Sequence, residues 1–398
     1  MKKLILLAMT ASLMLCTACA QQRTSEEDMG ASDAGTGAAG TDATDTGTAG
    51  TDTTSSGAAD TGAADTGTAA SGTTDGNETD SNGTNSNETV PNERTEPSGQ
   101  GEVPRIPDTP LRIPDDYLSP ASEQGTLERL EYTTYESFGY EERTMQLTKT
   151  AYVYLPYGYS EDESYNVFYL MHGGWANETA YLGTPENPNV LKDVIDHAIQ
   201  DGEMEPMLVV CPTYNNENPD DSDNYGLSLR LTDNYHNELL NDLIPAVEGK
   251  YSTYAEGTSP EELERSRDHR AFCGFSMGSV TTWHTFEYCL PYFRYFLPSS
   301  GDLTSDGQYM ERIVTDSGYG PEDFFIYAMS GTRDFDYSAF SRQIQAMLEA
   351  PGGIFIEADN EQDGNLAYRV QDGNEHNGEA AMQYIYNGLV WLWKGDIH

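Results

Sequence analysis

One long stretch of this chain lacks the residues that a folded structure requires, and it confines the fold to the residues after it. Residues 31–89 contain no aromatic residue, no Val, Ile, Leu or Met, and no Lys or Arg. Such a stretch has too little apolar surface to offset the entropy of ordering it. A Pro-rich segment then leads into ordinary apolar patterning near residue 117. We therefore predict a disordered acidic linker over residues 19–116 and one large folded domain over residues 117–398.

Residues 1–18 are predicted to be a lipoprotein signal peptide. Two lysines precede an apolar run over residues 4–15, which is too short to cross a bilayer as a helix. The Thr-Ala-Cys sequence that ends at Cys19 resembles the cleavage site of bacterial lipoproteins, with Cys16 at the position where leucine is usual. We expect Cys19 to be lipidated and to anchor an exported domain at the cell surface. An ordinary signal peptide cleaved near Ala20 is the alternative.

The charge of the chain excludes several classes of partner. There are 21 Lys and Arg against 66 Asp and Glu, which gives a formal net charge of −45. Such a surface repels nucleic acid and anionic lipid head groups. We therefore expect no nucleic-acid partner, and no membrane contact other than the N-terminal lipid anchor.

Three cysteines lie in the predicted folded domain: Cys211, Cys273 and Cys289. Each lies in or beside an apolar run, so we expect buried core residues. An odd number leaves at least one thiol free, and the sequence leaves open whether two of them pair. None has metal-ligand spacing, and no Cys and His cluster stands out along the sequence. We expect no metal site and no organic cofactor.

Dense apolar runs alternate with helical patterns through the domain. Strand-like runs cover residues 150–156, 165–171, 207–211, 271–275, 295–297, 324–329 and 366–370. Helical patterns cover residues 190–200, 235–251, 276–290, 338–349 and 378–393. This alternation predicts an α/β fold, with a mostly parallel central sheet flanked by helices. In such folds the functional site lies at the carboxyl ends of the strands.

The strongest candidate site is the sequence Gly-Phe-Ser-Met-Gly at residues 274–278. It follows a predicted strand and opens a predicted helix, which is the setting of a nucleophile elbow. The two glycines permit a sharp turn that leaves the serine hydroxyl exposed. We predict that Ser276 is a nucleophile and that the helix N-terminus stabilises negative charge developing beside it.

A nucleophilic serine needs a base, and the base of this motif comes late in the chain. His284 lies in the helix that begins at Ser276, so its side chain is expected to point away from the elbow. His398 is the last residue of the chain. His376 lies in a loop between a strand-like run and the last predicted helix, and we predict that it is the base.

The base needs a carboxylate to orient it. Asp334 lies just past the predicted strand at residues 324–329, at a carboxyl end of the sheet. We favour Asp334 as the acid. Asp336, two residues later, and Asp302, which follows the preceding strand, remain alternatives.

An oxyanion hole needs two N–H donors. We predict the N–H of Met277 as one donor. The other is expected from a His-Gly-Gly-Trp loop, at the N–H of Gly174 or Trp175. We assign His172 and Gly173 to the substrate-binding part of this loop, with His172 bracing the loop rather than acting as a base.

Residues 150–393 resemble the feruloyl and acetyl-xylan esterases of the first carbohydrate-esterase family, a branch of the esterase D-like α/β hydrolases. The matching segments are YLMHGG (169–174), NELLNDLIPAVEGKYS (237–252), DHRAFCGFSMGS (268–279), GTRD (331–334) and the late loop histidine, His376. The resemblance implies an α/β-hydrolase fold and a carboxylic ester hydrolase. It also implies the same roles for Ser276, Asp334 and His376.

This sequence departs from the family pattern around the site. Ser279 stands where a second glycine usually follows the elbow, and bulky Trp175 replaces a small residue in the oxyanion loop. Asn374 and Glu375 precede the late histidine, where glycines are common. These differences bear on the preferred acyl group and leave the three catalytic residue types in place.

The resemblance implies a secreted, membrane-tethered serine esterase that acts on feruloyl or acetyl esters of plant cell-wall xylan. Its partner would be a polysaccharide or oligosaccharide ester, met outside the cell. Another serine hydrolase or acyltransferase of this fold is an alternative, for example a siderophore esterase or a mycolyl-type transferase. A non-catalytic surface-binding lipoprotein is the third hypothesis. The Ser, Asp and His in the required order argue against it, because a binding module needs none of them.

Overall fold

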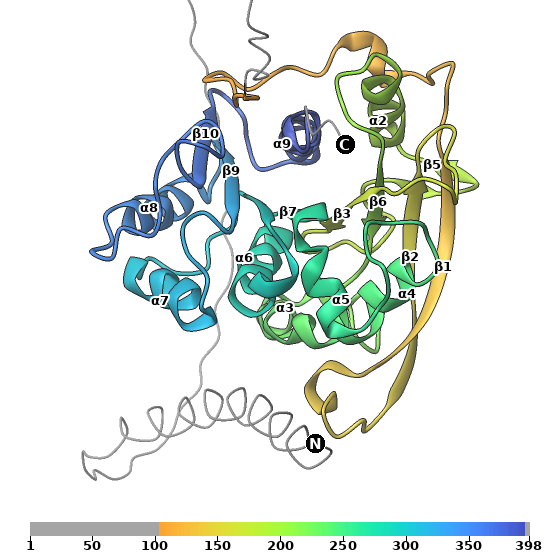
Figure 1. Ribbon diagram of the computed structural model, residues 1–398, viewed down its shortest axis with the longest axis horizontal. Coiled ribbons are helices and arrows are strands. Elements are labelled where there is room, and N and C mark those ends of the chain that lie inside the picture. The colour runs from red at the N-terminus through yellow and green to blue at the C-terminus, as the bar shows by residue number, and fades with distance from the viewer. Residues whose placement is uncertain (1–102, 395–398) are drawn as a thin grey trace, which may run out of the picture. The chain divides into compact units, whose positions relative to one another are not determined.

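The computed structural model describes residues 103–394 and shows an eight-stranded sheet between two layers of helices (Figure 1). The strands of this sheet are β1 (Thr126–Tyr135), β2 (Gln146–Leu155), β3 (Asn166–Met171), β6 (Met207–Cys211), β7 (Arg270–Phe275), β8 (Tyr295–Ser299), β9 (Phe325–Gly331) and β10 (Leu366–Gln371). Their spatial order is β1-β2-β6-β3-β7-β8-β9-β10. The pairs β1–β2 and β2–β6 are antiparallel, and all pairs from β6 onward are parallel. The mostly parallel sheet predicted from the sequence is confirmed.

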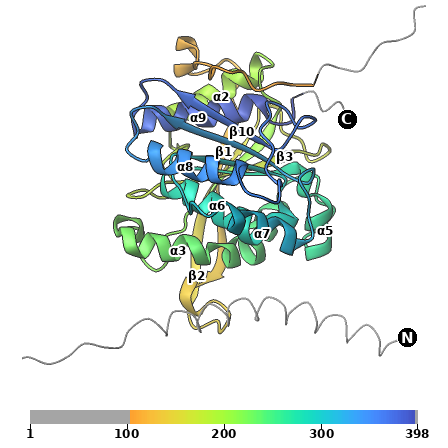
Figure 2. The ribbon, with the colours of Figure 1, turned by 90° about the vertical axis from the view of Figure 1, so that its left-hand side faces the viewer.

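Helices cover both faces of the sheet. The α-helices are α2 (Val190–Gln200), α3 (Tyr225–Glu238), α4 (Ile244–Glu248), α5 (Pro260–Arg265), α6 (Met277–Cys289), α7 (Gly307–Ser317), α8 (Tyr337–Leu348) and α9 (Gly378–Trp391). Helices α2 and α9 lie together on one face, and α3, α6, α7 and α8 lie on the other (Figures 1 and 2). Every residue of the five inner strands from β6 to β9 is buried, which explains why their sequences are dense apolar runs without alternation.

The helix predicted over residues 235–251 is divided in the structure. Helix α3 begins at Tyr225, where the Asn224 side chain accepts a hydrogen bond from the N–H of Leu227. After α3 ends, a π-helical turn (Leu239–Leu243) and the short α4 follow. Pro245 lies at the start of α4, and its missing N–H interrupts the regular hydrogen-bond ladder.

Several elements were not predicted from the sequence. These are β1 at the sheet edge, the short helix α5, the helix α7, and a two-stranded ribbon of β4 (Gly183–Thr184) and β5 (Asn187–Pro188). The strand β1 buries alternate residues only over part of its length, because one of its faces is open to solvent. Its pattern is therefore weaker than that of the inner strands.

A buried ion pair lies at the amino end of β7. The Arg270 side chain is 1% exposed, and its Nε and Nη2 atoms donate to the two carboxylate oxygens of Glu248 at 2.5 and 2.9 Å. Its other N–H groups donate to the carbonyls of Leu263 and Tyr292 and to the hydroxyl of Ser266. All five guanidinium N–H groups therefore have an acceptor, which is the condition for burying an arginine without a large penalty.

The domain begins before Tyr117, so the predicted linker boundary needs a correction. Residues 103–116 lie against the domain, and Ile106 is 1% exposed. The N–H of Ile106 donates to the carbonyl of Asp359 at 2.7 Å, and that of Leu111 donates to the Asn387 side chain at 2.7 Å. A few apolar side chains and backbone groups are enough to hold a Pro-rich segment that lacks periodic patterning. The predicted signal peptide, Cys19, the linker up to residue 102 and His398 lie outside the described residues.

The three cysteines of the domain behave as core residues. Cys211, Cys273 and Cys289 are free and buried, as expected, and burial raises the pKa of each thiol. Within residues 103–394, none of the helices combines the length and hydrophobicity that crossing a bilayer requires.

Candidate active site

Ser276 lies on the sharp turn between β7 and α6, as the motif predicts. Its backbone is in a left-handed conformation, with φ 61° and ψ −121°. This conformation is costly for a residue with a side chain and is characteristic of functional turns. The turn is also tightly packed: a Cβ on Gly274 would collide with the carbonyl of Gly278, and one on Gly278 would collide with that of Met171. Both glycines of the motif are therefore required by space.

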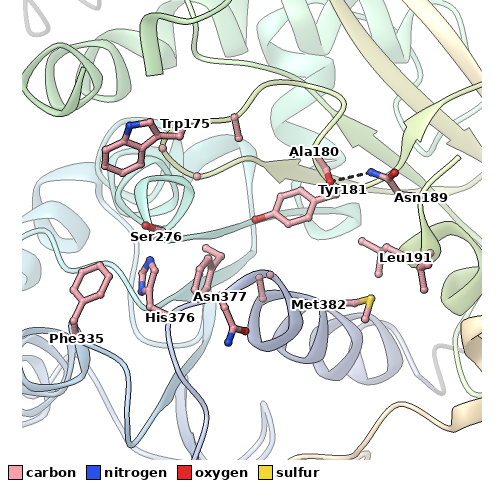
Figure 3. A pocket seen from close by; sticks show the side chains of 17 residues that line it. Trp175, Ala180, Tyr181, Asn189, Leu191, Ser276, Phe335, His376, Asn377 and Met382 are labelled. Atoms are coloured by element: carbon pink, nitrogen blue, oxygen red, sulfur yellow. Dashed lines mark hydrogen bonds between the residues drawn. The ribbon is translucent and has the colours of Figure 1, made fainter. Parts of the chain in front are cut away.

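His376 and Asp334 meet beside the elbow. The Nδ1 atom of His376 lies 2.9 Å from both carboxylate oxygens of Asp334, whose side chain is completely buried. Burial alone would raise the pKa of Asp334, but the hydrogen bonds from His376, from the N–H of Asp336 and from Ser300 outweigh it and lower this pKa. Figure 3 shows the other ring nitrogen of His376 turned toward Ser276. The structure therefore brings together the three residues that the sequence singled out.

Two phenylalanine rings contact the ring of His376. Phe275 lies 4.4 Å from it and Phe335 lies 4.1 Å from it, measured between ring centroids. Phe335 is 80% exposed, and it was not predicted from the sequence. The available signal was an apolar aromatic residue directly after Asp334 in a loop at the carboxyl end of the sheet.

The other two candidate acids occupy a different place. Asp336 donates its backbone N–H to Asp334 at 2.8 Å, so it supports the acid instead of replacing it. Burial, together with the negative charges of Asp302 and Asp334, raises the pKa of Asp336 to about 6. Among the described residues, the carboxylate that hydrogen-bonds to His376 is that of Asp334.

The His-Gly-Gly-Trp loop approaches the nucleophile at Gly173. A Cβ at this position would lie 3.2 Å from the carbonyl oxygen of Phe275 and 3.4 Å from the Cβ of Ser276. The prediction that the backbone N–H of Trp175 is an oxyanion donor is wrong, because this N–H donates to the carbonyl of Ser222 at 3.1 Å. In the hydrogen bonds of residues 103–394, the N–H groups of Gly174 and Met277 have no acceptor. These two N–H groups are the ones available to an oxyanion.

His172 braces this loop and does not line the site. It is 1% exposed, and its two ring nitrogens lie 2.7 Å from the Gly173 carbonyl and 2.7 Å from the Thr213 hydroxyl. Burial lowers the pKa of His172 to about 4, so the ring is neutral at pH 7. The expectation that His172 contacts substrate is therefore wrong, whereas the bracing role agrees with the structure.

A cavity of about 580 Å³ opens beside Ser276 and His376 (Figure 3). This volume lies within the range of roughly 300–1,000 Å³ that is typical of small-molecule sites. The cavity runs from the elbow toward α2 and α9, and Leu191, Met382 and Tyr181 line the part away from Ser276. These side chains were not predicted from the sequence. Leu191 and Met382 come from helix faces whose pattern is also that of a core, and Tyr181 lies in a turn before β4.

The lining carries no formal charge in a strongly acidic chain. Its polar side chains come from Ser276, His376, Tyr181, Asn189 and Asn377, and the remaining lining residues are apolar or glycine. A neutral, largely apolar cavity with a few polar groups favours an uncharged ligand that has a hydrophobic body.

Comparison with known proteins agrees with this geometry. The family model described as "Putative esterase" matches residues 143–287. Endo-1,4-beta-xylanase Y of Acetivibrio thermocellus is 36% identical over 286 residues, which are 70% of this chain and 24% of the xylanase. A serine-to-alanine mutant of the feruloyl esterase module from Clostridium thermocellum, solved in complex with sinapinate, is 34% identical with a TM-score of 0.64. That alignment covers 75% of this chain and 98% of the module.

This chain belongs to the feruloyl esterase family. Members of the feruloyl esterase family are carboxylic ester hydrolases, and the shared region spans nearly the whole of the solved module. The match to the family model includes Ser276 and ends before Asp334 and His376.

The curated relatives are much longer proteins. An endo-1,4-beta-xylanase/feruloyl esterase of Xylanibacter ruminicola is 31% identical over 140 residues, which are 34% of this chain and 17% of that protein. The chain therefore spans about a quarter or less of the length of the curated relatives that it matches. The feruloyl esterase family assignment rests on the esterase part of these proteins alone.

Proposed function

We propose that this chain is a serine esterase that releases hydroxycinnamoyl groups, such as feruloyl, from xylan. The observation that carries this proposal is the uncharged cavity beside Ser276 and His376. An acetyl group would fill only the mouth of this cavity, whereas an aromatic acyl group would reach Leu191 and Met382. The relative solved with sinapinate, a ligand of the same chemical type, supports this choice over an acetyl ester.

The proposed reaction follows from the positions of the side chains. His376 takes the proton of the Ser276 hydroxyl as the serine oxygen attacks the ester carbonyl, and Asp334 holds the imidazole in the required tautomer. The N–H groups of Gly174 and Met277 stabilise the oxyanion. The ester C–O bond then breaks, and His376 returns the proton to the departing sugar hydroxyl.

The second half of the reaction regenerates the enzyme. Water gives a proton to His376 and attacks the acyl group on Ser276, which releases the free acid and restores the serine hydroxyl. The exposed aromatic rings of Trp175 and Phe335 flank the mouth of the cavity, at 70% and 80% exposure. They are suited to stacking on the sugar that carries the ester.

The test compares acyl groups in one cavity. The full chain and its Met382→Trp variant are assayed with a feruloylated arabino-oligosaccharide, acetylated xylan and an aryl acetate. We expect fast feruloyl release by the wild-type chain. The indole should fill the far end of the cavity and lower feruloyl release at least tenfold while aryl acetate cleavage continues. Aryl acetate cleavage also controls for folding of the variant.

Other outcomes identify the rival functions. Efficient release of acetyl alone would replace feruloyl by acetyl as the acyl group, and cleavage of the aryl acetate alone would point to another hydrolase or acyltransferase of this fold. A siderophore esterase is disfavoured because the cavity lining has no Lys or Arg to hold an anionic ligand. Absence of Ser276-dependent cleavage of all three esters would contradict the enzyme hypothesis and favour a binding role.

The location of the protein is a separate part of the proposal. An exported domain held at the cell surface by a lipid on Cys19 suits a substrate too large to import. Metabolic labelling with a fatty-acid analogue, in the wild-type chain and in Cys19→Ala, tests it. Label that survives the substitution would overturn the lipid anchor without affecting the esterase proposal.

A further inference from the structure

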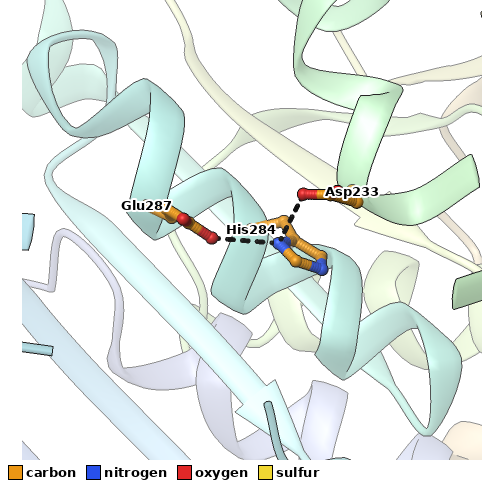
Figure 4. A group of neighbouring side chains, drawn as sticks. All are labelled: Asp233, His284 and Glu287. Atoms are coloured by element: carbon orange, nitrogen blue, oxygen red, sulfur yellow. Dashed lines mark hydrogen bonds and ion pairs between the residues drawn. The ribbon is translucent and has the colours of Figure 1, made fainter. Parts of the chain in front are cut away.

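A histidine and two carboxylates from two helices converge on the face of the sheet opposite α2 and α9 (Figure 4). Asp233 lies on α3, and His284 and Glu287 lie one turn apart on α6. The Nδ1 atom of His284 is 3.1 Å from a carboxylate oxygen of Glu287 and 3.5 Å from one of Asp233. One potential ligand atom from each of the three residues lies within 4.8 Å of the others.

This spacing is compatible with a shared metal ion in place of the hydrogen bond between His284 and Glu287. Ligand atoms at about 2.0–2.1 Å from a tetrahedral ion lie roughly 3.4 Å from one another. The two separations from Nδ1, 3.1 and 3.5 Å, bracket that value. A protonated Nδ1 has a single N–H and cannot donate well to two carboxylates at once. An Nδ1 without a proton would place three electron-pair donors around one point, which is an environment that suits a metal cation.

Tyrosine hydroxyls orient both carboxylates from outside the cluster. Tyr288 donates to Asp233 at 2.8 Å, and Tyr309 on α7 donates to Glu287. Hydrogen bonds of this kind fix the orientation of metal ligands in known metal sites. The imidazole of His284 is itself nearly buried, at 9% exposure of the residue, so its position is fixed by packing.

We propose that Asp233, His284 and Glu287 bind one divalent transition-metal ion, for which Zn²⁺ is the best match. One imidazole nitrogen and two carboxylate oxygens suit Zn²⁺ better than Mg²⁺ or Ca²⁺, which prefer oxygen ligands alone. Water would complete the tetrahedral shell. The ion would join α3 to α6, the helix that carries Ser276 at its N-terminus, so its role would be structural.

Two features explain why the sequence did not indicate this site. Asp233 is separated by about fifty residues from His284, and the pairing depends on how α3 packs against α6.

The acidity of the chain supports cation binding, because a net charge of −45 concentrates cations near the protein surface. The same acidity makes unspecific binding the main competing explanation.

The test titrates Zn²⁺ into the metal-depleted full chain by calorimetry, with Co²⁺ as a spectroscopic probe. We expect one tight site per chain, visible absorption bands of tetrahedral Co²⁺, and a higher unfolding temperature when Zn²⁺ is bound. Glu287→Gln and His284→Gln should weaken Zn²⁺ binding at least tenfold and abolish the Co²⁺ bands. Tyr309→Phe, which removes an outer hydrogen bond, should weaken binding about tenfold.

Matched controls separate this site from the acidic surface. His197→Gln changes a histidine on α2 that contacts the carbonyl of Ser119, and it should leave Zn²⁺ binding unchanged. Asp233→Asn is a third ligand variant, and its partly exposed side chain makes folding problems less of a concern. Equal Zn²⁺ affinity in the wild type and all three ligand variants would overturn the proposal, as would Mg²⁺ competing with Zn²⁺ at equal concentration. The result does not depend on esterase activity.

Discussion

The two ends of β7 show how one strand serves two purposes. At its amino end, Arg270 is buried and all of its N–H groups have acceptors. Just past its carboxyl end, Ser276 has a left-handed backbone, and the N–H of the next residue has no acceptor in the described structure. The amino end is where polar groups satisfy one another, and the carboxyl end is where they remain available to a substrate. Stability and catalysis should therefore respond separately to changes at the two ends.

Removing the nucleophile should give the largest effect. Ser276→Ala should lower kcat/KM for a feruloyl ester by about 10⁴-fold or more, which corresponds to roughly 5 kcal/mol of transition-state stabilisation. The free energy of unfolding, measured with urea, should change by less than about 1 kcal/mol. Ser279→Ala, one turn further along α6, is the control and should retain most of the activity. Equal losses in both variants would break the comparison, because the effect would then be structural.

Breaking the ion pair should give the reverse result. Glu248→Ala leaves a buried guanidinium without its carboxylate, and we expect a loss of about 3–5 kcal/mol in the free energy of unfolding. The folded fraction should keep its kcat/KM. Glu128→Ala removes half of an exposed pair with Lys250 and should cost about 1 kcal/mol or less. If Glu248→Ala unfolded at the same urea concentration as Glu128→Ala, the buried pair would not have the stabilising role assigned to it.

A methyl group in the oxyanion loop should have an intermediate effect. Gly173→Ala places a Cβ 3.2 Å from the Phe275 carbonyl, so the loop must shift by a few tenths of an ångström. We expect kcat/KM to fall about tenfold, or roughly 1.4 kcal/mol, with little change in stability. Gly226→Ala on α3, outside the cavity lining, is the matched control, since its nearest contact would be an ordinary 3.7 Å. Similar kinetics for both variants would contradict the steric argument.

Replacing Asp336 should give the smallest effect, a pH-dependent change in stability. The pKa of this carboxyl, about 6, lies above its usual value near 4, so the native state holds a proton that the unfolded state has lost between those pH values. Stability from this group is present near pH 4 and is lost as pH rises through 6. Asp336→Asn should therefore stabilise the protein above pH 6, by about 1 kcal/mol after allowance for solvent screening, and not at pH 4.

Thermal unfolding of the wild type and Asp336→Asn at pH 4, 6 and 8 checks this dependence. A constant difference at all three values would show that Asp336 does not titrate in this range.

The parts of the site that could be predicted depend on local sequence. The strand, turn and helix around Ser276 are contiguous in the sequence, and the two glycines are required because a Cβ at either position would collide with backbone near the turn. Asp334 could be placed because it follows an inner strand whose apolar run is unambiguous. His376 followed from the order of the residues in the chain, because few histidines come after the elbow.

The parts that could not be predicted depend on contacts between distant segments. The N–H of Trp175 is used by the carbonyl of Ser222, and no pattern near Trp175 indicates that. From the sequence, Glu248 has the pattern of an exposed helix residue, and its pairing with Arg270 follows only from the fold. The cavity wall shares this difficulty, since an apolar helix face that lines a cavity has the same periodicity as one that packs in a core.

The segment over residues 103–116 has a consequence for how the domain can be cut from the chain. The backbone N–H of Ile106 donates a hydrogen bond to Asp359, and that of Leu111 donates one to Asn387 of α9. Helix α9 is one of the two helices toward which the cavity extends. A protease that trims the chain from its N-terminus would therefore meet hydrogen-bonded backbone from Ile106 onward, well before Tyr117. A fragment that started at residue 117 would lack this covering over α9 and would begin inside the domain.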